Sequence, residues 1–239
     1  MIDLHSHLLP GVDDGSQSLE ESLDVLANYE EHGITELVLT PHYIPFTSQV
    51  SSRAENLKLY AKLCLRAREA DIHIKLHLAN ELYIDPNITD NLRKNLISPL
   101  GRDHTGKTYL LVELPMSGEF NGFEDILHNL SAEGFQVVLA HPERYATVKA
   151  NYKTVEKFLA AGVLLQCNLG SLIGQYGHRA KRTIKKLLKD NYVFAFGTDV
   201  HAAYDDYYDL DRAAAKLVHL VGPKKAHALL EENPKKLLA

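Results

Sequence analysis

Met1-Ile-Asp-Leu-His5-Ser-His7 opens the chain and has the pattern of one short strand that ends in a His-x-His pair. The apolar Ile2 and Leu4 alternate with polar residues, which is typical of a β-strand with one buried face. His5 and His7 are two residues apart, so both point to the same side of that strand. Two such imidazoles can bind a divalent metal ion, although an isolated His-x-His motif near a terminus is more often incidental.

The composition of the 239 residues is that of an ordinary globular protein. Hydrophobic residues make up 45% of the chain and charged residues 24%, and the net charge of -5 gives no electrostatic footprint for nucleic acid. No apolar run reaches the roughly 18 residues that a membrane-spanning helix needs. Charged and histidine residues interrupt the N-terminal stretch from Asp3 onward, unlike a signal peptide. We therefore expect a cytoplasmic protein without nucleic-acid binding or membrane insertion.

The two cysteines, Cys64 and Cys167, define no disulfide framework. Neither has an arginine six residues further on, so the phosphate-binding loop of thiol-dependent phosphatases is absent. Two buried thiols in a reducing compartment are the expected interpretation.

Short β-like runs alternate with longer helix-like runs along the whole chain. After the first strand, the β-like runs are 34–40, 72–79, 109–112, 136–140, 163–167 and 193–196. The helix-like runs are 18–33, 51–70, 86–98, 122–133, 151–161 and 184–189, followed by two C-terminal helices that divide near Gly222. This alternation predicts parallel strands with right-handed crossovers. We expect an α/β fold, a distorted TIM-like (β/α)7 barrel in a single domain over residues 1–239. A doubly wound open sheet is the alternative.

Residues that bind metals follow nearly every predicted strand. The strand ends carry His5, His7, His42, Glu81, Glu113, His141, Asn168, Asp199 and His201. In barrels of this kind the carboxyl ends of the strands meet at one face and form the active site. Each residue alone has an ordinary explanation as a core histidine or a solvated carboxylate. As a set they predict a metal centre, because buried carboxylates without a cationic partner are costly.

The number of candidate ligands indicates more than one metal ion. The set is too large for one tetrahedral zinc and suits two or three ions, with a carboxylate such as Glu81 bridging. Imidazole and carboxylate without thiolate favour Mn, Fe or Zn. Asp13-Asp14-Gly15, in the loop after the histidine pair, can reach the same mouth, or it forms an ordinary Asp-Gly turn.

A multinuclear centre suits hydrolysis, because it acidifies a bound water and neutralises charge on a phosphoryl or carbonyl oxygen. Arg144, three residues after His141, can bind phosphate oxygens through its fork of N–H groups, or it can form a surface ion pair. Tyr145 can pack against a substrate ring, although a structural role is the more ordinary one.

The chain resembles the PHP (polymerase and histidinol phosphatase) superfamily. The resemblance rests on His5-Ser-His7, Asp13-Asp14-Gly15, Thr40-Pro-His42, Ala79-Asn-Glu81-Leu-Tyr83, Leu111-Val-Glu113, Ala140-His141-Pro-Glu-Arg144-Tyr and Thr198-Asp199-Val-His201. Their order and spacing are most similar to the bacterial manganese-dependent protein-tyrosine phosphatases of capsule and exopolysaccharide operons. The resemblance runs from Met1 to Pro234.

The resemblance implies a role for each matching residue. His5, His7, Glu81 and Asp199 would hold the first metal; Glu81, Glu113 and His141 the second; and Asp14 (or Asp13), His42 and His201 the third. Arg144 would bind the phosphate, and with His42 and His201 it makes up the catalytic set. The cofactor would be Mn²⁺. The substrate would be phosphotyrosine on the C-terminal tail of a bacterial tyrosine autokinase, and the reaction would regulate polysaccharide synthesis.

The loop after His201 departs from the family pattern. Family members usually carry a second arginine there, whereas this chain has Ala202-Ala-Tyr-Asp-Asp206-Tyr-Tyr. Carboxylates in that loop would repel phosphate. Arg212, further on, is a weak candidate to replace the arginine. The three tyrosines, Tyr204, Tyr207 and Tyr208, can line an approach for a tyrosyl ring or simply pack within the loop.

Two other functions are weighed against phosphotyrosine hydrolysis. One keeps the enzyme class but has a small phosphomonoester, such as histidinol phosphate, as substrate. The other is a catalytically silent, metal-stabilised protein that binds a kinase or a polymerase, which the complete ligand set disfavours. The basic run Arg179–Lys189 is either a solvated helix face or a docking surface for an acidic kinase tail.

Overall fold

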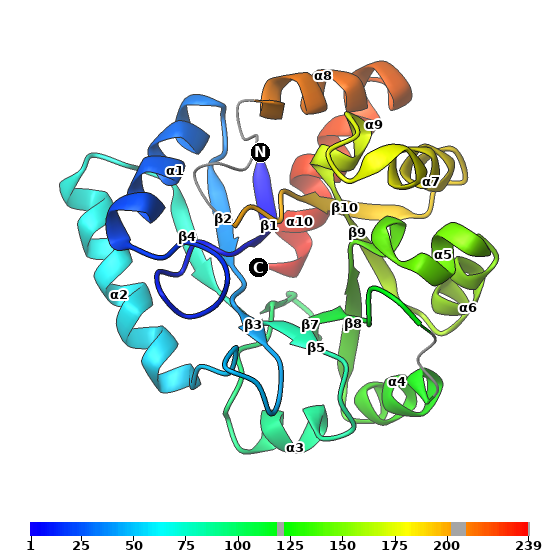
Figure 1. Ribbon diagram of the computed structural model, residues 1–239, viewed down its shortest axis with the longest axis horizontal. Coiled ribbons are helices and arrows are strands. Elements are labelled where there is room, and N and C mark those ends of the chain that lie inside the picture. Colours follow the sequence, from blue (N-terminus) through cyan, green and yellow to red (C-terminus); the bar gives the residue numbers. More distant parts are fainter. Residues whose placement is uncertain (119–121, 202–208, 239) are drawn as a thin grey trace.

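Parallel strands surround the centre of the molecule and follow one another around it in the order of the chain (Figure 1). The computed structural model describes residues 1–118, 122–201 and 209–238. The strands are β1 (Ile2–Ser6), β2 (Glu36–Leu39), β3 (His42–Tyr43), β4 (Lys75–Leu78), β5 (Glu81–Tyr83), β7 (Thr108–Glu113), β8 (Phe135–Ala140), β9 (Leu164–Asn168) and β10 (Val193–Gly197). A short β6 (Gly101–Arg102) pairs antiparallel with β7. The strand order has no reversal point of the doubly wound kind.

Strand pairing divides this ring into two sheets. One has the order β1-β2-β4 and the other β10-β9-β8-β7-β5-β3. The division falls at Pro41, between β2 and β3, because proline has no N–H to donate to a neighbouring strand. The first and last strands adjoin, since Asp199 N donates to His5 O at 2.8 Å and His7 N donates to Val200 O at 2.8 Å. The expected barrel is therefore a ring whose hydrogen bonding is interrupted.

The helices cover the outside of the ring, except for the last of them, which lies over its centre (Figure 1). They are α1 (Leu19–Glu31), α2 (Arg53–Glu69), α3 (Ile88–Arg93), α4 (Phe123–Ala132), α5 (Ala146–Ala150), α6 (Thr154–Ala160), α7 (Gly177–Lys189), α8 (Leu210–Val221), α9 (Pro223–His227) and α10 (Asn233–Leu237). Ser18 caps α1 by accepting from Glu21 N, and Ser52 caps α2 in a full capping box. None of the helices in the described ranges has the length and apolarity that a membrane crossing requires.

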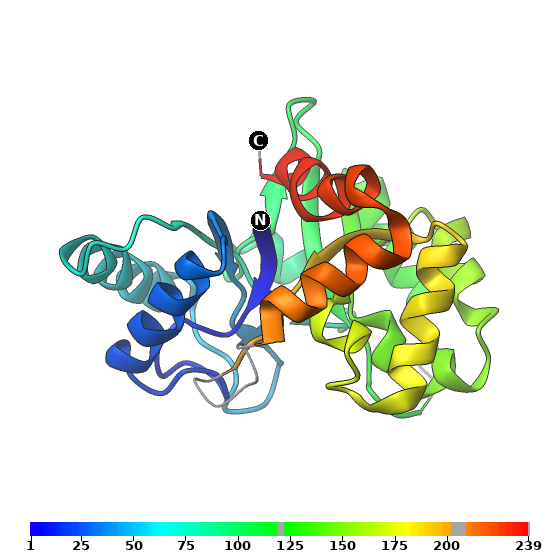
Figure 2. The same cartoon turned by 90° about the horizontal axis from the view of Figure 1, so that it is seen from above.

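The core has an outer and an inner part. The outer part fills the space between helices and strands, with Leu26, Leu63 and Leu187 among its fully buried members. The inner part is small and contains Leu4 and Leu237, so the end of the chain helps to fill the ring. Figure 2 shows this C-terminal segment beside the N-terminus. Several boundaries differ from expectation: β4 and α3 are shorter than predicted, and β3, β5, β6 and α5 were not predicted.

Candidate metal centre

The predicted ligands come together at one face of the ring. Their ligand atoms form four groups, and within each group the atoms lie within 4.8 Å of one another. The groups are His7, Asp14, His42 and His201; His5, His7 and Glu81; His5, His141 and Asp199; and His42, Glu81 and Glu113. Every residue to which the resemblance assigns a metal belongs to at least one group, with Asp14 rather than Asp13, while Asn168 instead donates to Asp199 Oδ2 at 2.7 Å. The structure thus confirms their proximity, while their role as ligands stays a prediction.

Backbone turns at the strand ends aim two of these side chains. His141 follows β8 with φ of 34°, and Asp199 follows β10 with φ of 59°. Left-handed backbone at residues other than glycine costs free energy and is found most often at functional sites. His42 and Glu81 differ from expectation, because each is the first residue of a short strand, β3 or β5, rather than lying beyond a strand end.

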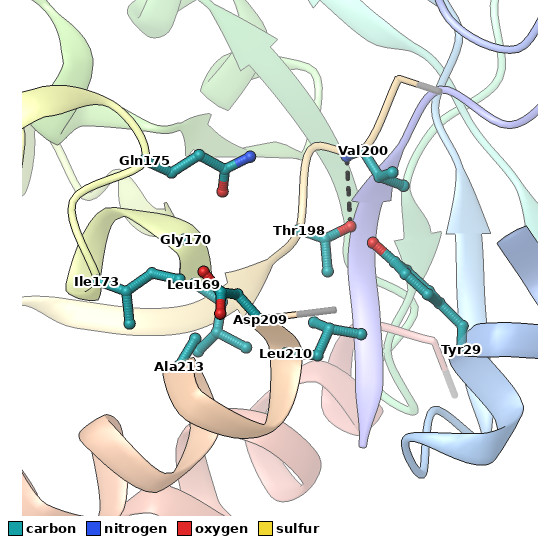
Figure 3. Close-up of a pocket in the computed structure, with 10 residues that line it drawn as sticks. All are labelled: Tyr29, Leu169, Gly170, Ile173, Gln175, Thr198, Val200, Asp209, Leu210 and Ala213. Carbon is teal, nitrogen blue, oxygen red and sulfur yellow. Dashed lines mark hydrogen bonds between the residues drawn. The ribbon is translucent and has the colours of Figure 1, made fainter. Parts of the chain in front are cut away.

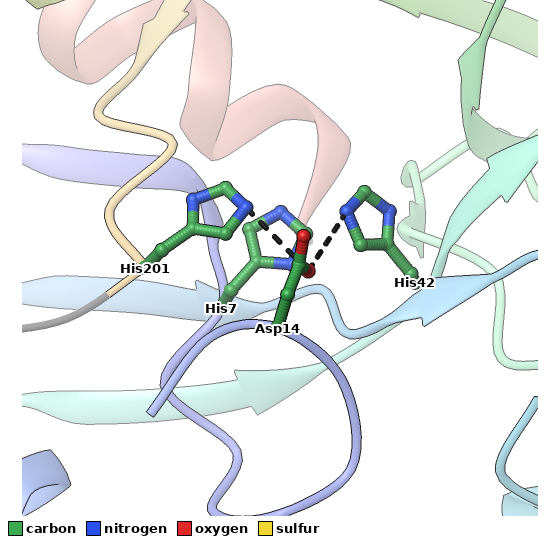
Figure 4. A group of neighbouring side chains, drawn as sticks. All are labelled: His7, Asp14, His42 and His201. Atoms are coloured by element: carbon green, nitrogen blue, oxygen red, sulfur yellow. Dashed lines mark ion pairs between the residues drawn. The ribbon is translucent and has the colours of Figure 1, made fainter. Parts of the chain in front are cut away.

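The exposed edge of the centre is formed by histidines around Asp14 (Figure 4). His42 Nε2 lies 3.4 Å from Asp14 Oδ1, and His201 Nε2 lies 3.8 Å from the same oxygen. The imidazole of His7 stacks against that of His201, with 4.1 Å between the ring centroids. Four side chains from three distant parts of the chain therefore offer nitrogen and oxygen atoms to one point.

Asp13 has a different position from Asp14. Its Oδ2 accepts from His7 Nδ1 at 2.8 Å and from His42 N at 2.9 Å, and its Oδ1 accepts from Gly15 N at 3.0 Å. The contact with His7 holds the pKa of Asp13 below its usual range although burial opposes this. Such a carboxylate orients a metal-binding imidazole from behind. The geometry therefore favours Asp14 as ligand and Asp13 as the group that positions His7.

The buried centre is organised around Glu81. Its Oε1 lies 2.9 Å from His141 Nε2, and its Oε2 lies 2.9 Å from His42 Nδ1 and 3.3 Å from His5 Nε2. Burial alone would raise the pKa of Glu81, but the surrounding histidines hold it well below the usual value. Burial and the nearby Glu81 raise the pKa of Glu113 to about 8. The protein thus favours the ionised form of Glu81 and disfavours the ionised form of Glu113.

Three buried atoms at this point have no hydrogen-bond partner among the described residues: Glu81 Oε2, His42 Nδ1 and His141 Nδ1. His42 Nδ1 is close to Glu81 Oε2 but is not oriented to donate to it. Unpaired buried polar atoms are costly. Of the three, Glu81 Oε2 and His42 Nδ1 lie 2.9 Å apart without a hydrogen bond, and two such lone pairs side by side suit a divalent cation. The residues therefore fit a metal centre.

Two further imidazoles are held in one tautomer by acceptors behind them. His5 Nδ1 contacts Gln166 Oε1 at 3.0 Å, and His201 Nδ1 contacts Asp199 O at 3.0 Å. With Nδ1 as donor, each Nε2 faces the centre with its lone pair. Gln166 was not predicted as a site residue. The signal that could have found it is a polar side chain in the buried run of β9, two residues before Asn168.

Arg144 borders the centre at the end of a short 3-10 segment, η1 (Pro142–Arg144). Its Nη1 donates to Asp199 Oδ2, and its guanidinium lies over the ring of Tyr176, 4.3 Å from the centroid. The side chain of Arg144 is 24% exposed. Two contacts thus fix the guanidinium while its remaining N–H groups stay available. Neighbouring Tyr145 is structural, because its buried hydroxyl donates to Ala140 O and accepts from Leu114 N.

Comparison with known proteins identifies the family. The family model described as capsular polysaccharide synthesis, CpsB/CapC, matches residues 1–239. The chain belongs to this family. It is 27% identical to the tyrosine-protein phosphatase CpsB of Streptococcus pneumoniae, over 100% of this chain and 98% of that protein. It is 26% identical to the tyrosine-protein phosphatase YwqE of Bacillus subtilis (strain 168), over 100% and 91%.

A solved structure has the same fold as this CpsB/CapC member. It comes from work on YwqE of Bacillus subtilis and CpsB of Streptococcus pneumoniae, which are described there as unique metal-dependent tyrosine phosphatases. The TM-score is 0.89 at 24% identity, over 100% of this chain and 94% of the other. The two chains therefore share the same overall fold.

The loop in which this CpsB/CapC chain departs from the family pattern lies outside the described residues. This applies to the acids and tyrosines of 202–208, including the tyrosines considered for a substrate ring. Arg212, the weak candidate for the second arginine, pairs with Asp209 at 3.0 Å near the start of α8. Arg212 therefore has a local ion-pair partner, and the contact does not support a role for it in phosphate binding.

A small cavity behind the centre is no substrate site. It is lined by residues from the end of β10, from α8 and from the segment after β9, with Tyr29 on the other side (Figure 3). Its volume of about 20 Å³ is enough for one water molecule. Val200 N donates to Thr198 Oγ along its wall at 3.3 Å. The cavity is therefore too small for a phosphorylated side chain.

Proposed function

We propose that this protein is a metal-dependent protein-tyrosine phosphatase that hydrolyses phosphotyrosine on a bacterial tyrosine kinase and so regulates capsular or exopolysaccharide synthesis. The observation that carries the proposal is the convergence of imidazoles and carboxylates on one face, bordered by Arg144. The relatives named as tyrosine-protein phosphatases support the choice of substrate. A single domain over residues 1–239 and a cytoplasmic location stay predictions.

The proposed centre binds two or three metal ions, with manganese favoured and iron or zinc as alternatives. His5, His7, Glu81 and Asp199 hold the first ion, Glu81 with Glu113 and His141 the second, and Asp14, His42 and His201 the third. When bound, such ions activate water and neutralise charge on the phosphoryl group. The four groups of ligand atoms match this division only in part, because His7 also lies with the third set, His42 lies with Glu81 and Glu113, and His141 and Asp199 lie with His5.

The protein's own side chains bind and orient the phosphate. Arg144 offers parallel N–H donors to the non-bridging oxygens, and its position on Tyr176 reduces the rotamer entropy lost on binding. Asp199 holds Nη1 of Arg144, so the guanidinium cannot turn away from the mouth. His42 and His201 complete the catalytic set at the open edge, where they would hold the third ion beside the reacting phosphate.

Hydrolysis of p-nitrophenyl phosphate and of a phosphotyrosine peptide tests the proposal. We expect activity to be lost on chelation and restored by Mn²⁺. Arg144→Ala should lower kcat/KM on the order of 100-fold, because donors at the phosphate act mainly in the transition state. Arg66→Ala is the matched control, since Arg66 is exposed and pairs only with Glu69 within α2. Activity that survives exhaustive chelation would contradict the proposal.

His5 tests the centre separately from the fold. We expect His5→Ala to abolish turnover while the protein still folds, because the adjacent core depends on Ile2 and Leu4. Circular dichroism and gel filtration check folding, and His73→Ala is the control because that imidazole is exposed. Kinetics on histidinol phosphate beside the phosphopeptide decide the substrate class: a higher kcat/KM on histidinol phosphate would replace the proposed substrate.

A further inference from the structure

Cationic side chains gather where η1, α5 and α7 meet, beside the phosphate-binding Arg144. Arg144 ends η1, Lys149 lies in α5, and Arg179 lies in the first turn of α7. α7 packs against both η1 and α5, so residues far apart in the chain become neighbours (Figure 1). Tyr176, directly before α7, lies under the guanidinium of Arg144 and ties the start of α7 to the mouth of the centre.

Lys149 and Arg179 differ from Arg144 in having no ion-pair partner among the described residues. Within the described ranges neither side chain forms an ion pair or a hydrogen bond, whereas Arg144 is held by Asp199. The acid that acts on Lys149 is Glu143, which is fully buried: its Oε1 accepts from Asn168 N and Ser171 Oγ, and its Oε2 has no hydrogen-bond partner among the described residues. Arg144 is thus the one cation of the three that has an ion pair among the described residues.

The charges of this cluster repel one another. Burial lowers the pKa of Lys149, and Arg179 and Arg144 lower it further. Like charges brought together by a fold cost stability. The cost is offset when an anion binds between them, and this is how many anion sites are built.

Other cations of α7 are occupied or lie further away. Lys181 Nζ donates to Ile173 O at 3.1 Å, and Lys186 Nζ lies over the ring of Tyr152, 3.5 Å from the centroid. The basic run of the sequence is therefore not one uniform docking surface. Only its N-terminal end, at Arg179, meets Lys149 and Arg144.

We propose that Lys149 and Arg179 form a second anion subsite, which receives a further anionic group of the substrate polypeptide next to the phosphotyrosine held by Arg144. This inference rests on the proposed function and specifies the substrate: a segment with phosphotyrosine and a second phosphate or carboxylate nearby. Both groups have the required chemistry, and the experiment separates them. Lys149 and Arg179 are specificity residues, because they contact no reacting atom.

Steady-state kinetics on four peptides test the subsite. One carries a single phosphotyrosine between neutral residues, and the second and third add another phosphotyrosine two and three residues away. The fourth replaces that second phosphotyrosine with glutamates. We expect the wild type to prefer the doubly anionic peptides through KM. K149A/R179A should reduce that preference about tenfold, since two partly exposed charge pairs together contribute about that factor.

A matched variant controls for net charge. K185A/K189A removes two exposed lysines of the same helix, with Lys189 ten residues or about 15 Å beyond Arg179. This control should keep the wild-type preference. The wild-type preference should also weaken with salt, because the subsite is partly exposed, and the double variant should show a flatter salt dependence.

Each outcome supports or overturns the subsite. A wild-type preference that K149A/R179A leaves intact overturns it, and so does an equal loss on all four peptides. If the wild type prefers only the peptides with a second phosphotyrosine, the subsite takes phosphate. If it also prefers the peptide with glutamates, the subsite takes carboxylates as well. Binding of the same peptides with a non-hydrolysable phosphonate in place of phosphotyrosine is measured by calorimetry. If the wild type hydrolyses none of the peptides, the proposed function fails, and the binding preference still tests the subsite.

Discussion

Replacing Asp13 with asparagine separates the group that orients an imidazole from the groups that bind the metal. Asp13 accepts three hydrogen bonds, from His7 Nδ1, His42 N and Gly15 N. An asparagine has one acceptor oxygen. With that oxygen in the place of Oδ2 it loses the bond from Gly15, and in the place of Oδ1 it loses the other two.

The expected cost follows from those bonds. A hydrogen bond to a charged group contributes about 1.5–3 kcal/mol, so Asp13→Asn should destabilise the metal-free protein by about 2 kcal/mol. For a chain of this size that lowers Tm by about 4–8 °C. Loss of the group behind a metal-binding histidine typically weakens metal affinity about 10- to 100-fold.

Thermal unfolding of the metal-free protein and metal competition with a chromogenic chelator measure the two effects. At saturating Mn²⁺ the Asp13→Asn variant should recover the wild-type number of bound ions. Asp14→Asn is the comparison, because Asp14 has a side chain that is 57% exposed and should cost little stability. It should instead bind one ion fewer at any concentration. The reverse pattern, with Asp13→Asn losing an ion and Asp14→Asn losing none, would refute the assignment.

Three further changes probe the surroundings of the centre. Gly197→Ala places a Cβ 2.7 Å from His5 Cβ. We expect this overpacking to destabilise the protein by about 1–3 kcal/mol and to lower kcat. Unchanged kinetics would show that the surrounding side chains move to accommodate the methyl group. Ser52→Ala removes the cap of α2 and should cost about 1 kcal/mol in urea unfolding at unchanged kcat/KM; lost activity would contradict this. Burial acts to raise the pKa of Glu36, but its contact with His77 lowers that pKa overall. The contact therefore stabilises the fold at pH values above the pKa of Glu36 in the unfolded chain, and this contribution is lost as the pH falls through the pKa of Glu36 in the folded protein. Glu36→Gln should reduce the loss of stability on acidification below about pH 4.5 by less than about 1 kcal/mol, and acid unfolding curves of equal steepness would argue against it.

The sequence by itself determined the alternation of strands and helices and the kinds of side chain at the strand ends. Both are local properties: apolar residues repeat every two or every 3.6 positions, and a capping serine such as Ser18 marks a helix start. Strands as short as β3 and β5 escape such patterns, because two or three residues define no period. Proline at position 41 was visible, but its effect on strand pairing depends on which strands are neighbours.

Only the tertiary structure decided how the ligands divide among groups and which residues lie behind them. The choice between Asp13 and Asp14 depends on a loop that folds back onto His7, and the part played by Gln166 depends on β9 lying beside His5. Lys149 belongs to no motif, and Arg179 is distinguished in the sequence only as the first residue of a basic run. Such relations are distances between residues remote in sequence, set by backbone turns and packing, and no local pattern contains them.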